Sequence, residues 1–191
     1  MIDNLVNIDR DLFLFLNGLN TSWLDPVMFW ISKGGIWIPF YLFLVWLVGK
    51  QYGRQTLWIL LFVALMIAAG DQLANLVKEG THRLRPSQDT TLCCVHIVNG
   101  YRGGTYGFYS AHASNTFALA VFLVMVMRKR YRWIAAVMIP WAFIMSYTRI
   151  YLGVHFPGDM LVGAMVGVLL GWGFGAGFLR LTRAINPRAD S

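Results

Sequence analysis

The sequence predicts an all-α integral membrane protein, with a helical bundle of five to six transmembrane helices and an N-terminal interfacial amphipathic helix. The 191 residues are 57% apolar, the mean hydropathy is +0.54, and several apolar runs exceed 18 residues. Sixteen basic and nine acidic residues give a net charge of +7. In a membrane protein such an excess orients the chain, so we expect no nucleic-acid partner. We predict a single transmembrane domain over residues 1–191.

Residues 3–19 have the pattern of an amphipathic helix that lies in the membrane interface. Its apolar side chains recur near one face: Leu5, Ile8, Leu12, Phe15, Leu16 and Leu19. Polar residues, which include Asp9, Arg10 and Asn17, cover the rest of the surface.

The apolar runs that follow predict the transmembrane helices. Residues 23–49 are interrupted by Lys33-Gly34-Gly35, which predicts a short helix, a break and a second helix. The sequence leaves open whether this pair crosses once or folds back. Further spans are expected at 56–77, 110–127, 133–147 with Pro140 as a kink, and 157–179, where Pro157 suits a first helical turn.

Glycine recurs every four residues in the last span and predicts a smooth ridge where a neighbouring helix approaches closely. These glycines are Gly163, Gly167, Gly171 and Gly175.

Clusters of basic residues predict the orientation of the chain. They are Lys50 and Arg54, then Arg128, Lys129, Arg130 and Arg132, then Arg180, Arg183 and Arg188. With five crossings all three clusters lie on one side, which should be cytoplasmic. The 78–110 loop and the 149–157 turn then share the opposite side.

Arg149, His155 and Asp159 stand between the last two apolar spans. An ionisable residue at that depth indicates a functional site. Arginine can hold a phosphate with two donors, and histidine can act as nucleophile or proton carrier. A nearby carboxylate can fix the imidazole tautomer. The alternative is that these residues only end two helices at the interface.

Lys78 and Arg85 follow the second span and are seven residues apart, which would place them on one face of a helix. Pro86 favours an extended conformation at Arg85, and Gly80 can end the helix earlier. A basic collar at a helix end is an equally good interpretation of this pair.

The segment Tyr109-Ser110-Ala111-His112 begins the third span, and Ser110 has the chemistry of an N-cap. A helix start offers free N–H groups and the positive end of the dipole, which together bind anions. His112 would then lie within reach of a bound phosphate. The alternative is a capping serine beside an interfacial histidine.

One topology places all three polar segments on the same side of the membrane. Together they supply cations, two histidines, a carboxylate and a helix N-terminus. This set matches phosphoryl transfer without a metal, in which positioning and charge stabilisation do most of the catalysis.

Several polar residues allow more than one interpretation. Asp71 shares a helix face with Lys78, so it either supports Lys78 or makes a structural contact between helices. His82 and Arg83 are interpreted as interface residues, although Arg83 has the length to touch a second phosphate. His96 has no partner that the sequence identifies.

Cys93 and Cys94 are adjacent, so they are not expected to bridge each other or to form a zinc site. Their redox state is left open.

In order, Lys-x6-Arg-Pro from Lys78, Ser-x-His from Ser110 and Arg-x5-His-x3-Asp from Arg149 resemble the signature of the type-2 phosphatidic acid phosphatase superfamily. That superfamily also includes the vanadium haloperoxidases and bacterial acid phosphatases. The sequence departs from the usual Pro-Ser-Gly-His at Tyr109 to His112, and from the usual Ser-Arg at Thr148-Arg149. Neither departure removes a proposed chemical group.

The resemblance implies that one group of residues holds the phosphate: Lys78, Arg85, Ser110, Ala111 through its N–H, and Arg149. His155, initially neutral, would attack phosphorus and form a phosphohistidine, while Asp159 orients it. His112, initially protonated, would protonate the leaving group and then activate water. Asp71 and Thr148 are expected to support these residues. No metal or other cofactor is implied.

The activity implied is that of a metal-independent lipid phosphatase of the bacterial cytoplasmic (inner) membrane, with its active site on the extracytoplasmic side. The resemblance offers undecaprenyl diphosphate, phosphatidylglycerophosphate, phosphatidic acid and lipid A phosphates as substrates, and the compact chain favours undecaprenyl diphosphate. The expected partners are the lipid phosphate and membrane lipids, and the oligomeric state is open. The alternatives are a lipid phosphotransferase and a non-catalytic lipid-binding or transport protein.

Overall fold

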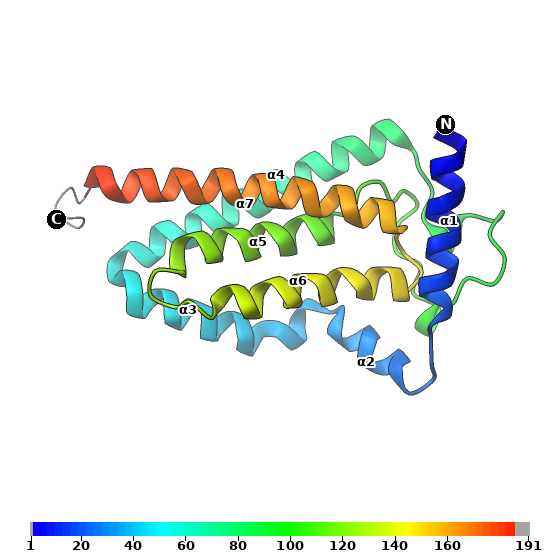
Figure 1. The fold of residues 1–191 in the computed structure, drawn as a ribbon, viewed down its shortest axis with the longest axis horizontal. Helices are drawn as coiled ribbons and strands as arrows, with labels where there is room; N and C mark the ends of the chain where they lie inside the picture. Colours follow the sequence, from blue (N-terminus) through cyan, green and yellow to red (C-terminus); the bar gives the residue numbers. More distant parts are fainter. Residues whose placement is uncertain (1, 186–191) are drawn as a thin grey trace.

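The computed structural model describes residues 2–185, which form a bundle of helices with one helix, α1 (Ile2–Gly18), across its end (Figure 1). Within this range the only β pairing is an isolated bridge between Leu84 and Tyr106. The predicted all-α class is therefore confirmed.

The long helices lie lengthwise beside one another, and their bounds follow the predicted apolar runs (Figure 1). They are α3 (Ile38–Tyr52), α4 (Thr56–Thr81), α5 (Ala111–Met127), α6 (Ile134–Tyr151) and α7 (Pro157–Ile185). Helix α7 begins at Pro157, as predicted, and α6 continues as one helix through Pro140. Short 3-10 turns lie between the helices: η1 (Gly34–Trp37), η2 (Gly53–Gln55), η3 (Pro86–Gln88) and η4 (Val98–Gly100).

The first apolar run forms one interrupted pass. Helix α2 (Leu24–Ile31), η1 and α3 follow one another from the end that carries α1 toward the opposite end (Figure 1). The Trp37 indole donates to the Ile31 carbonyl at 2.8 Å, and the Ser32 hydroxyl donates to Phe29 at 2.9 Å. These bonds satisfy carbonyl groups that the break frees, as a nonpolar environment requires.

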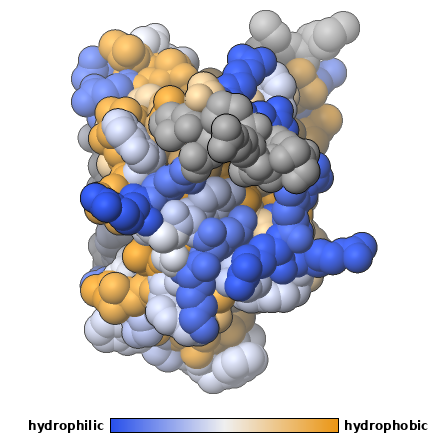
Figure 2. Space-filling model, turned by 90° about the vertical axis from the view of Figure 1, so that its left-hand side faces the viewer, coloured by the Kyte–Doolittle hydropathy of each residue, from blue (hydrophilic) through white to orange (hydrophobic). Residues whose placement is uncertain are grey.

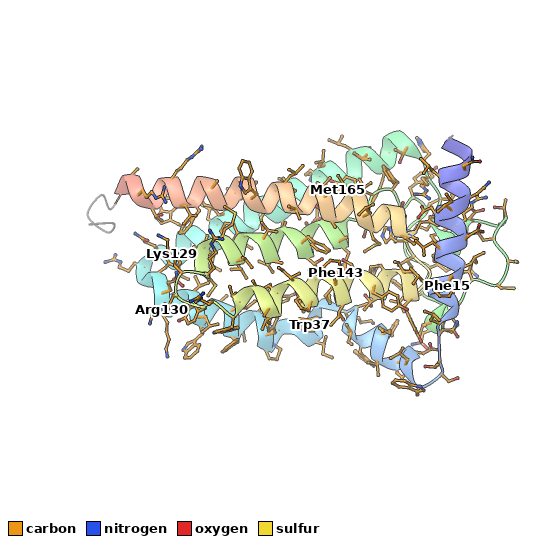
Figure 3. All side chains as sticks on the ribbon, viewed as in Figure 1. Phe15, Trp37, Lys129, Arg130, Phe143 and Met165 are labelled. Carbon is orange, nitrogen blue, oxygen red and sulfur yellow. The ribbon has the colours of Figure 1, made fainter. Side chains whose placement is uncertain are left out.

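Three helical stretches of the described chain are long and apolar enough to cross a membrane: Gly34–Thr81, which contains α3 and α4, Ile134–Tyr151 and Pro157–Ala184. Helix α5 is a shorter apolar helix among them. Large apolar side chains such as Phe143 and Met165 remain exposed on the outside of the bundle (Figure 3). An apolar outer surface on helices of this length fits lipid as the surrounding solvent.

The predicted basic clusters gather at the end of the bundle opposite α1. Lys129 and Arg130 mark this end in Figure 3, at the connection between α5 and α6. Seen from that side, several hydrophilic side chains lie around the helix ends (Figure 2). Arg188 lies outside the described residues. The basic clusters that are described therefore share one end, as the predicted topology requires.

The glycine ridge on α7 packs against α5, as predicted. A Cβ atom at Gly163 would lie 2.5 Å from the Ser110 carbonyl, and Cβ atoms at Gly167 and Gly171 would collide with carbonyls of α5. Gly175 faces the Met125 side chain instead. The two backbones thus approach as closely as small residues allow.

Helix α1 contacts the bundle through the face that the sequence analysis treated as a polar covering. Asn17 is 1% exposed and donates to the Ile150 and Tyr151 carbonyls at 3.0 and 2.9 Å, so it caps the end of α6. Asp9 accepts the Gly158 N–H at 2.7 Å, in the first turn of α7. Assigning these residues to the outer surface was wrong, because each of them pairs with backbone groups at a helix end.

The predicted apolar face of α1 remains exposed along most of its length: Leu5, Ile8, Leu12, Phe15 and Leu19. This face is available to lipid while the polar face holds the α6–α7 turn.

We expect Gly167→Ala to lower the free energy of unfolding by about 1–3 kcal/mol, because the added methyl group meets the backbone of α5. Gly173→Ala is the matched control, since a Cβ there meets nothing within 4 Å, and it should be neutral or stabilising by about 0.5–1 kcal/mol. Denaturant unfolding in detergent micelles measures both changes. Equal effects would contradict the packing described for α5 and α7.

Candidate active site

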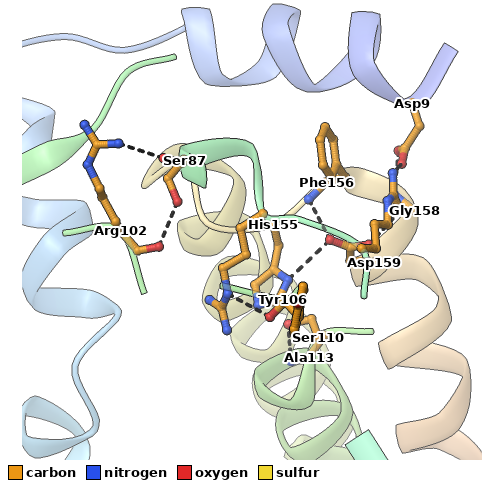
Figure 4. Close-up of polar contacts among 12 residues, drawn as sticks. Asp9, Ser87, Arg102, Tyr106, Ser110, Ala113, His155, Phe156, Gly158 and Asp159 are labelled. Carbon is orange, nitrogen blue, oxygen red and sulfur yellow. Dashed lines mark hydrogen bonds and ion pairs between the residues drawn. The ribbon is translucent and has the colours of Figure 1, made fainter. Parts of the chain in front are cut away.

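The structure brings the three predicted polar segments together at the end of the bundle next to α1 (Figure 4). His155 lies within electrostatic range of Arg85, Arg149 and Asp159. Lys78 interacts with Arg85, and His112 with Arg149. Residues that are up to 81 positions apart in the sequence therefore form one charged cluster.

Lys78 and Arg85 reach this cluster without sharing a helix face. Helix α4 ends at Thr81, and His82 adopts a left-handed conformation with φ of 49°. Arg85 is extended, as Pro86 predicts, and its backbone N–H donates to Thr105 at 3.1 Å. Its Nε donates to the Tyr106 carbonyl at 3.1 Å. The seven-residue spacing thus spans a helix end and a turn.

Ser110 caps α5, as predicted: its hydroxyl accepts the Ala113 N–H at 3.3 Å (Figure 4). The first N–H groups of the helix, including that of Ala111, have no carbonyl partner within the helix. The Nε2 atom of His112 is buried and has no hydrogen-bond partner among the described residues. The N-terminus of α5 and the unpaired imidazole nitrogen of His112 therefore lie within one turn of helix.

Arg149 lies in the last turn of α6 and is only 8% exposed. One terminal nitrogen donates to the Tyr101 hydroxyl at 3.0 Å, while its buried Nε has no partner in residues 2–185. The hydroxyl of the neighbouring Thr148 donates to the Met145 carbonyl at 2.7 Å. The Thr148 hydroxyl is therefore hydrogen-bonded within α6, whereas the Nε–H of Arg149 has no partner in the described chain.

His155 and Asp159 are held by the turn between α6 and α7. The Asp159 Oδ2 atom accepts the Phe156 N–H at 3.0 Å and lies 3.4 Å from His155 Nδ1 (Figure 4). This contact assigns the imidazole proton to Nδ1 and leaves a lone pair on Nε2. Burial lowers the pKa of His155 to about 4, against the opposing effect of Asp159, so the ring is uncharged at neutral pH.

Arg83, interpreted from the sequence as an interface residue, makes ion pairs within the polar cluster. Its guanidinium lies between two carboxylates, donating to Asp159 Oδ1 at 2.7 Å and to Asp9 Oδ2 at 2.6 Å. Each terminal nitrogen gives one of its two N–H groups to a carboxylate, so Asp159 and Asp9 together hold the guanidinium. The carboxylates are 74 and 76 positions from Arg83 in the sequence, so local spacing carried no signal for this arrangement.

Tyr101 is a further residue that the sequence analysis did not identify. Burial opposes ionisation of its hydroxyl, but the Arg149, Arg85 and Lys33 charges lower the Tyr101 pKa below its ordinary value. The loop that carries it is fixed because Arg102 and Ser87 exchange two hydrogen bonds, at 2.7 and 2.9 Å (Figure 4).

The remaining polar candidates have structural partners. Asp71 accepts the Asn115 amide at 2.8 Å, which joins α4 to α5, and its interaction with Lys78 is only electrostatic. His96 does have a partner, since its Nε2 lies 2.8 Å from Asp25 Oδ1. Cys93 and Cys94 are exposed free thiols.

An apolar cavity of about 360 Å³ adjoins the cluster on the side of α3 and α4. His112, Asn115 and Thr116 supply polar groups to its lining, and side chains such as Leu44 and Leu123 supply most of the rest. His112 therefore borders both the charged cluster and a cavity whose apolar lining suits a hydrocarbon chain.

Comparison with known proteins relates this arrangement to a family and to named relatives. Residues 56–183 match the model of the PAP2 superfamily. The chain is 40% identical over 178 residues to a lipid A 4′-phosphatase of Bacteroides thetaiotaomicron, covering 91% of this chain and 78% of that protein. A lipid A 4′-phosphatase of Porphyromonas gingivalis is 35% identical, covering 89% and 72%.

A solved structure shares the fold. It is a transmembrane PAP2-type phosphatidylglycerolphosphate phosphatase from Bacillus subtilis, with a TM-score of 0.68 and 23% identity. The match covers 93% of this chain and 87% of that one.

We expect Arg149→Lys to weaken the binding of orthovanadate by roughly 10- to 100-fold, because lysine loses the planar pair of donors and hydrogen bonds to charged groups contribute about 1.5–3 kcal/mol. Arg130→Lys, at the opposite end of the bundle, is the control and should bind as the unmodified chain does. Isothermal titration calorimetry in detergent measures both affinities. An unchanged affinity in Arg149→Lys would contradict an anion site at this cluster.

Proposed function

Because the chain belongs to the PAP2 superfamily, we propose that it removes a phosphate group from a membrane lipid by way of a phosphohistidine at His155. The observation that carries this proposal is the position of His112, between the cationic cluster and the apolar cavity. A lipid phosphate placed there has its phosphorus among cations and its hydrocarbon part in an apolar space. The proposal covers the whole chain as one lipid-phosphatase domain.

In the first step, Nε2 of neutral His155 attacks phosphorus and the bond to the leaving oxygen breaks. Lys78, Arg85, Arg149, Ser110 and the Ala111 N–H would stabilise the phosphate oxygens in this step. His112, which becomes protonated once the negative charge of the phosphate is bound beside it, gives its proton to the leaving oxygen. Asp159 keeps the Nδ1 proton in place and stabilises the positive charge that His155 acquires.

In the second step, His112 takes a proton from water as the water oxygen attacks phosphorus. The phosphorus–nitrogen bond breaks, inorganic phosphate leaves, and both histidines return to their starting states. Neither step uses a metal ion, so we propose that the reaction needs none.

For the substrate, we propose a phosphate monoester of lipid A. This choice is supported by the two relatives named as lipid A 4′-phosphatases, at 40% and 35% identity. It replaces the preference for undecaprenyl diphosphate, which rested only on the compactness of the chain.

We also propose that the reaction occurs on the extracytoplasmic side of the bacterial inner membrane. The described basic clusters lie at the end opposite the charged site, and basic residues favour the cytoplasm (Figure 3). The site would then lie at headgroup level in the outer leaflet.

Purified protein in mixed micelles should release inorganic phosphate from lipid A faster than from undecaprenyl diphosphate, phosphatidylglycerophosphate or phosphatidic acid. His155→Ala should lower phosphate release by at least about 10³-fold, since the attacking group is lost. A colorimetric phosphate assay measures both.

EDTA should leave the rate of phosphate release unchanged. Cys93→Ser is the control variant for His155→Ala, because the Cys93 thiol is exposed and has no part in the proposed reaction. No release from any of the four lipids, or full release by His155→Ala, would overturn the proposed activity. A different preferred lipid would overturn only the substrate.

The protonated, positively charged form of His155 should lose its proton with a midpoint near pH 4. The reason is that burial lowers the pKa of His155 to about 4 from an ordinary 6.5. The neutral nucleophile is then fully present at neutral pH and is lost only as the pH falls through about 4. The measurement is a pH titration of histidine-labelled protein by ¹⁵N NMR, with the signal assigned by His155→Gln. A midpoint near 6.5 would contradict the buried, uncharged ring.

A further inference from the structure

We propose that Arg83, held in place by Asp9 of α1, is a positioning residue that acts as the permanent counter-ion of Asp159 and so leaves His155 free to remain uncharged. The proposal rests on the function proposed above, in which His155 attacks phosphorus. It assigns roles to Asp9, which lies outside the three sequence motifs, and to Arg83, which occupies an unspecified position within the Lys-x6-Arg-Pro motif.

The geometry is that of one guanidinium shared by two carboxylates. Arg83 Nη1 lies 2.7 Å from Asp159 Oδ1, and Nη2 lies 2.6 Å from Asp9 Oδ2. The Asp159 side chain is fully buried, whereas those of Asp9 and Arg83 are 15% and 25% exposed. The pair is therefore formed largely out of contact with water, where removing one partner is costly.

A buried carboxylate at Asp159 requires a positive partner to remain ionised. Two residues of the described chain contact its oxygens and can supply this charge: His155, whose Nδ1 is 3.4 Å from Oδ2, and Arg83, at 2.7 Å from Oδ1. Lys78 and Arg85 interact with Asp159 electrostatically, without a direct hydrogen bond to it. If His155 supplied the charge, its Nε2 would carry a proton and could not attack phosphorus. Arginine is charged at every relevant pH, so Arg83 removes the need for a proton on His155.

The other charged groups around His155 act in the same direction. Arg85 from the loop after α4 and Arg149 from α6 both disfavour a second proton on the ring, and His112 from α5 faces it as well. Asp159 from α7 is the opposing group. Arg83 contacts Asp159 and not the imidazole. It therefore weakens the effect of the Asp159 charge, which favours a second proton on His155.

Asp9 fixes Arg83 from the side of α1. Its Oδ1 accepts the Gly158 N–H at 2.7 Å, in the first turn of α7, where the helix dipole favours a negative charge. A Cβ at Gly158 would lie 2.8 Å from Asp9 Oδ2, so the glycine is what permits this approach. The guanidinium also lies 4.4 Å from the centre of the Phe156 ring. Helix α1 thereby takes part in positioning Asp159.

Arg83 differs in this respect from the cations proposed to hold phosphate. Each of its terminal nitrogens is bonded to a carboxylate, whereas the Arg149 Nε is buried without a partner in the described chain. The loss of Arg83 should therefore lower kcat with little change in KM.

The test compares Arg83→Gln, Arg83→Lys and Asp9→Asn with Arg10→Gln. Arg10 is the matched control, because it forms a 2.7 Å ion pair between the same helix and Asp89 but does not touch Asp159. Arg83→Gln should lower kcat roughly 10- to 100-fold with KM within about twofold, and Asp9→Asn should do so to a smaller extent. Arg10→Gln should change neither value.

The distinguishing readout is the titration of His155 by ¹⁵N NMR, which needs no substrate. In Arg83→Gln the midpoint should rise by at least about one pH unit, because Asp159 is then left with His155 as its partner. Arg83→Lys keeps the charge, so its midpoint should stay near that of the unmodified chain even though its geometry and kcat are impaired.

An unchanged midpoint in a folded Arg83→Gln, or in Asp9→Asn if the former does not fold, would overturn the proposal. So would equal effects of Arg10→Gln, which would indicate that any loosening of α1 suffices. A raised KM with unchanged kcat would instead make Arg83 a phosphate-binding residue. If the unmodified chain released no phosphate from any lipid, the proposed function would fail, while the titration would still decide the role of Arg83.

Discussion

The structure depends on one buried carboxylate. Asp159 has no exposed surface, and its two oxygens accept from the Arg83 guanidinium, the Phe156 N–H and the His155 imidazole. A group of this kind is stable inside a protein only when every acceptor is satisfied and its charge is compensated. The start of α7 and the loop after α4 carry residues that make these contacts. Helix α1 supports them through Asp9, which binds the Arg83 guanidinium.

The packing of α5 against α7 sets the distance between the two histidine segments. Gly163 allows the backbone of α7 to approach the Ser110 carbonyl, and the Ser110 N–H donates to the Asp159 carbonyl at 3.1 Å. The N-terminus of α5 is thereby held beside the α6–α7 turn. A larger residue at Gly163 would move the N-terminus of α5 away from the turn that holds His155.

The sequence predicted those features that depend on local pattern. Apolar runs located the helices, Pro157 located the start of α7, and Ser110 was identified as a cap because N-cap chemistry acts within three residues. Arg83 was missed because its partners lie more than 70 positions away. Asn17 was assigned to the wrong face for a related reason, since a polar residue that caps another helix has the same local pattern as one that faces solvent.

The central claim is that uncharged His155, oriented by Asp159, forms the covalent intermediate. The most direct measurement is to quench the unmodified chain during its first turnover of lipid A labelled in its phosphate and to locate the label by mass spectrometry under alkaline conditions. The account predicts a phosphorylated peptide that contains His155, and no labelled peptide in the His155→Ala variant. Phosphate release without any labelled protein, or a label on a different residue, would contradict it.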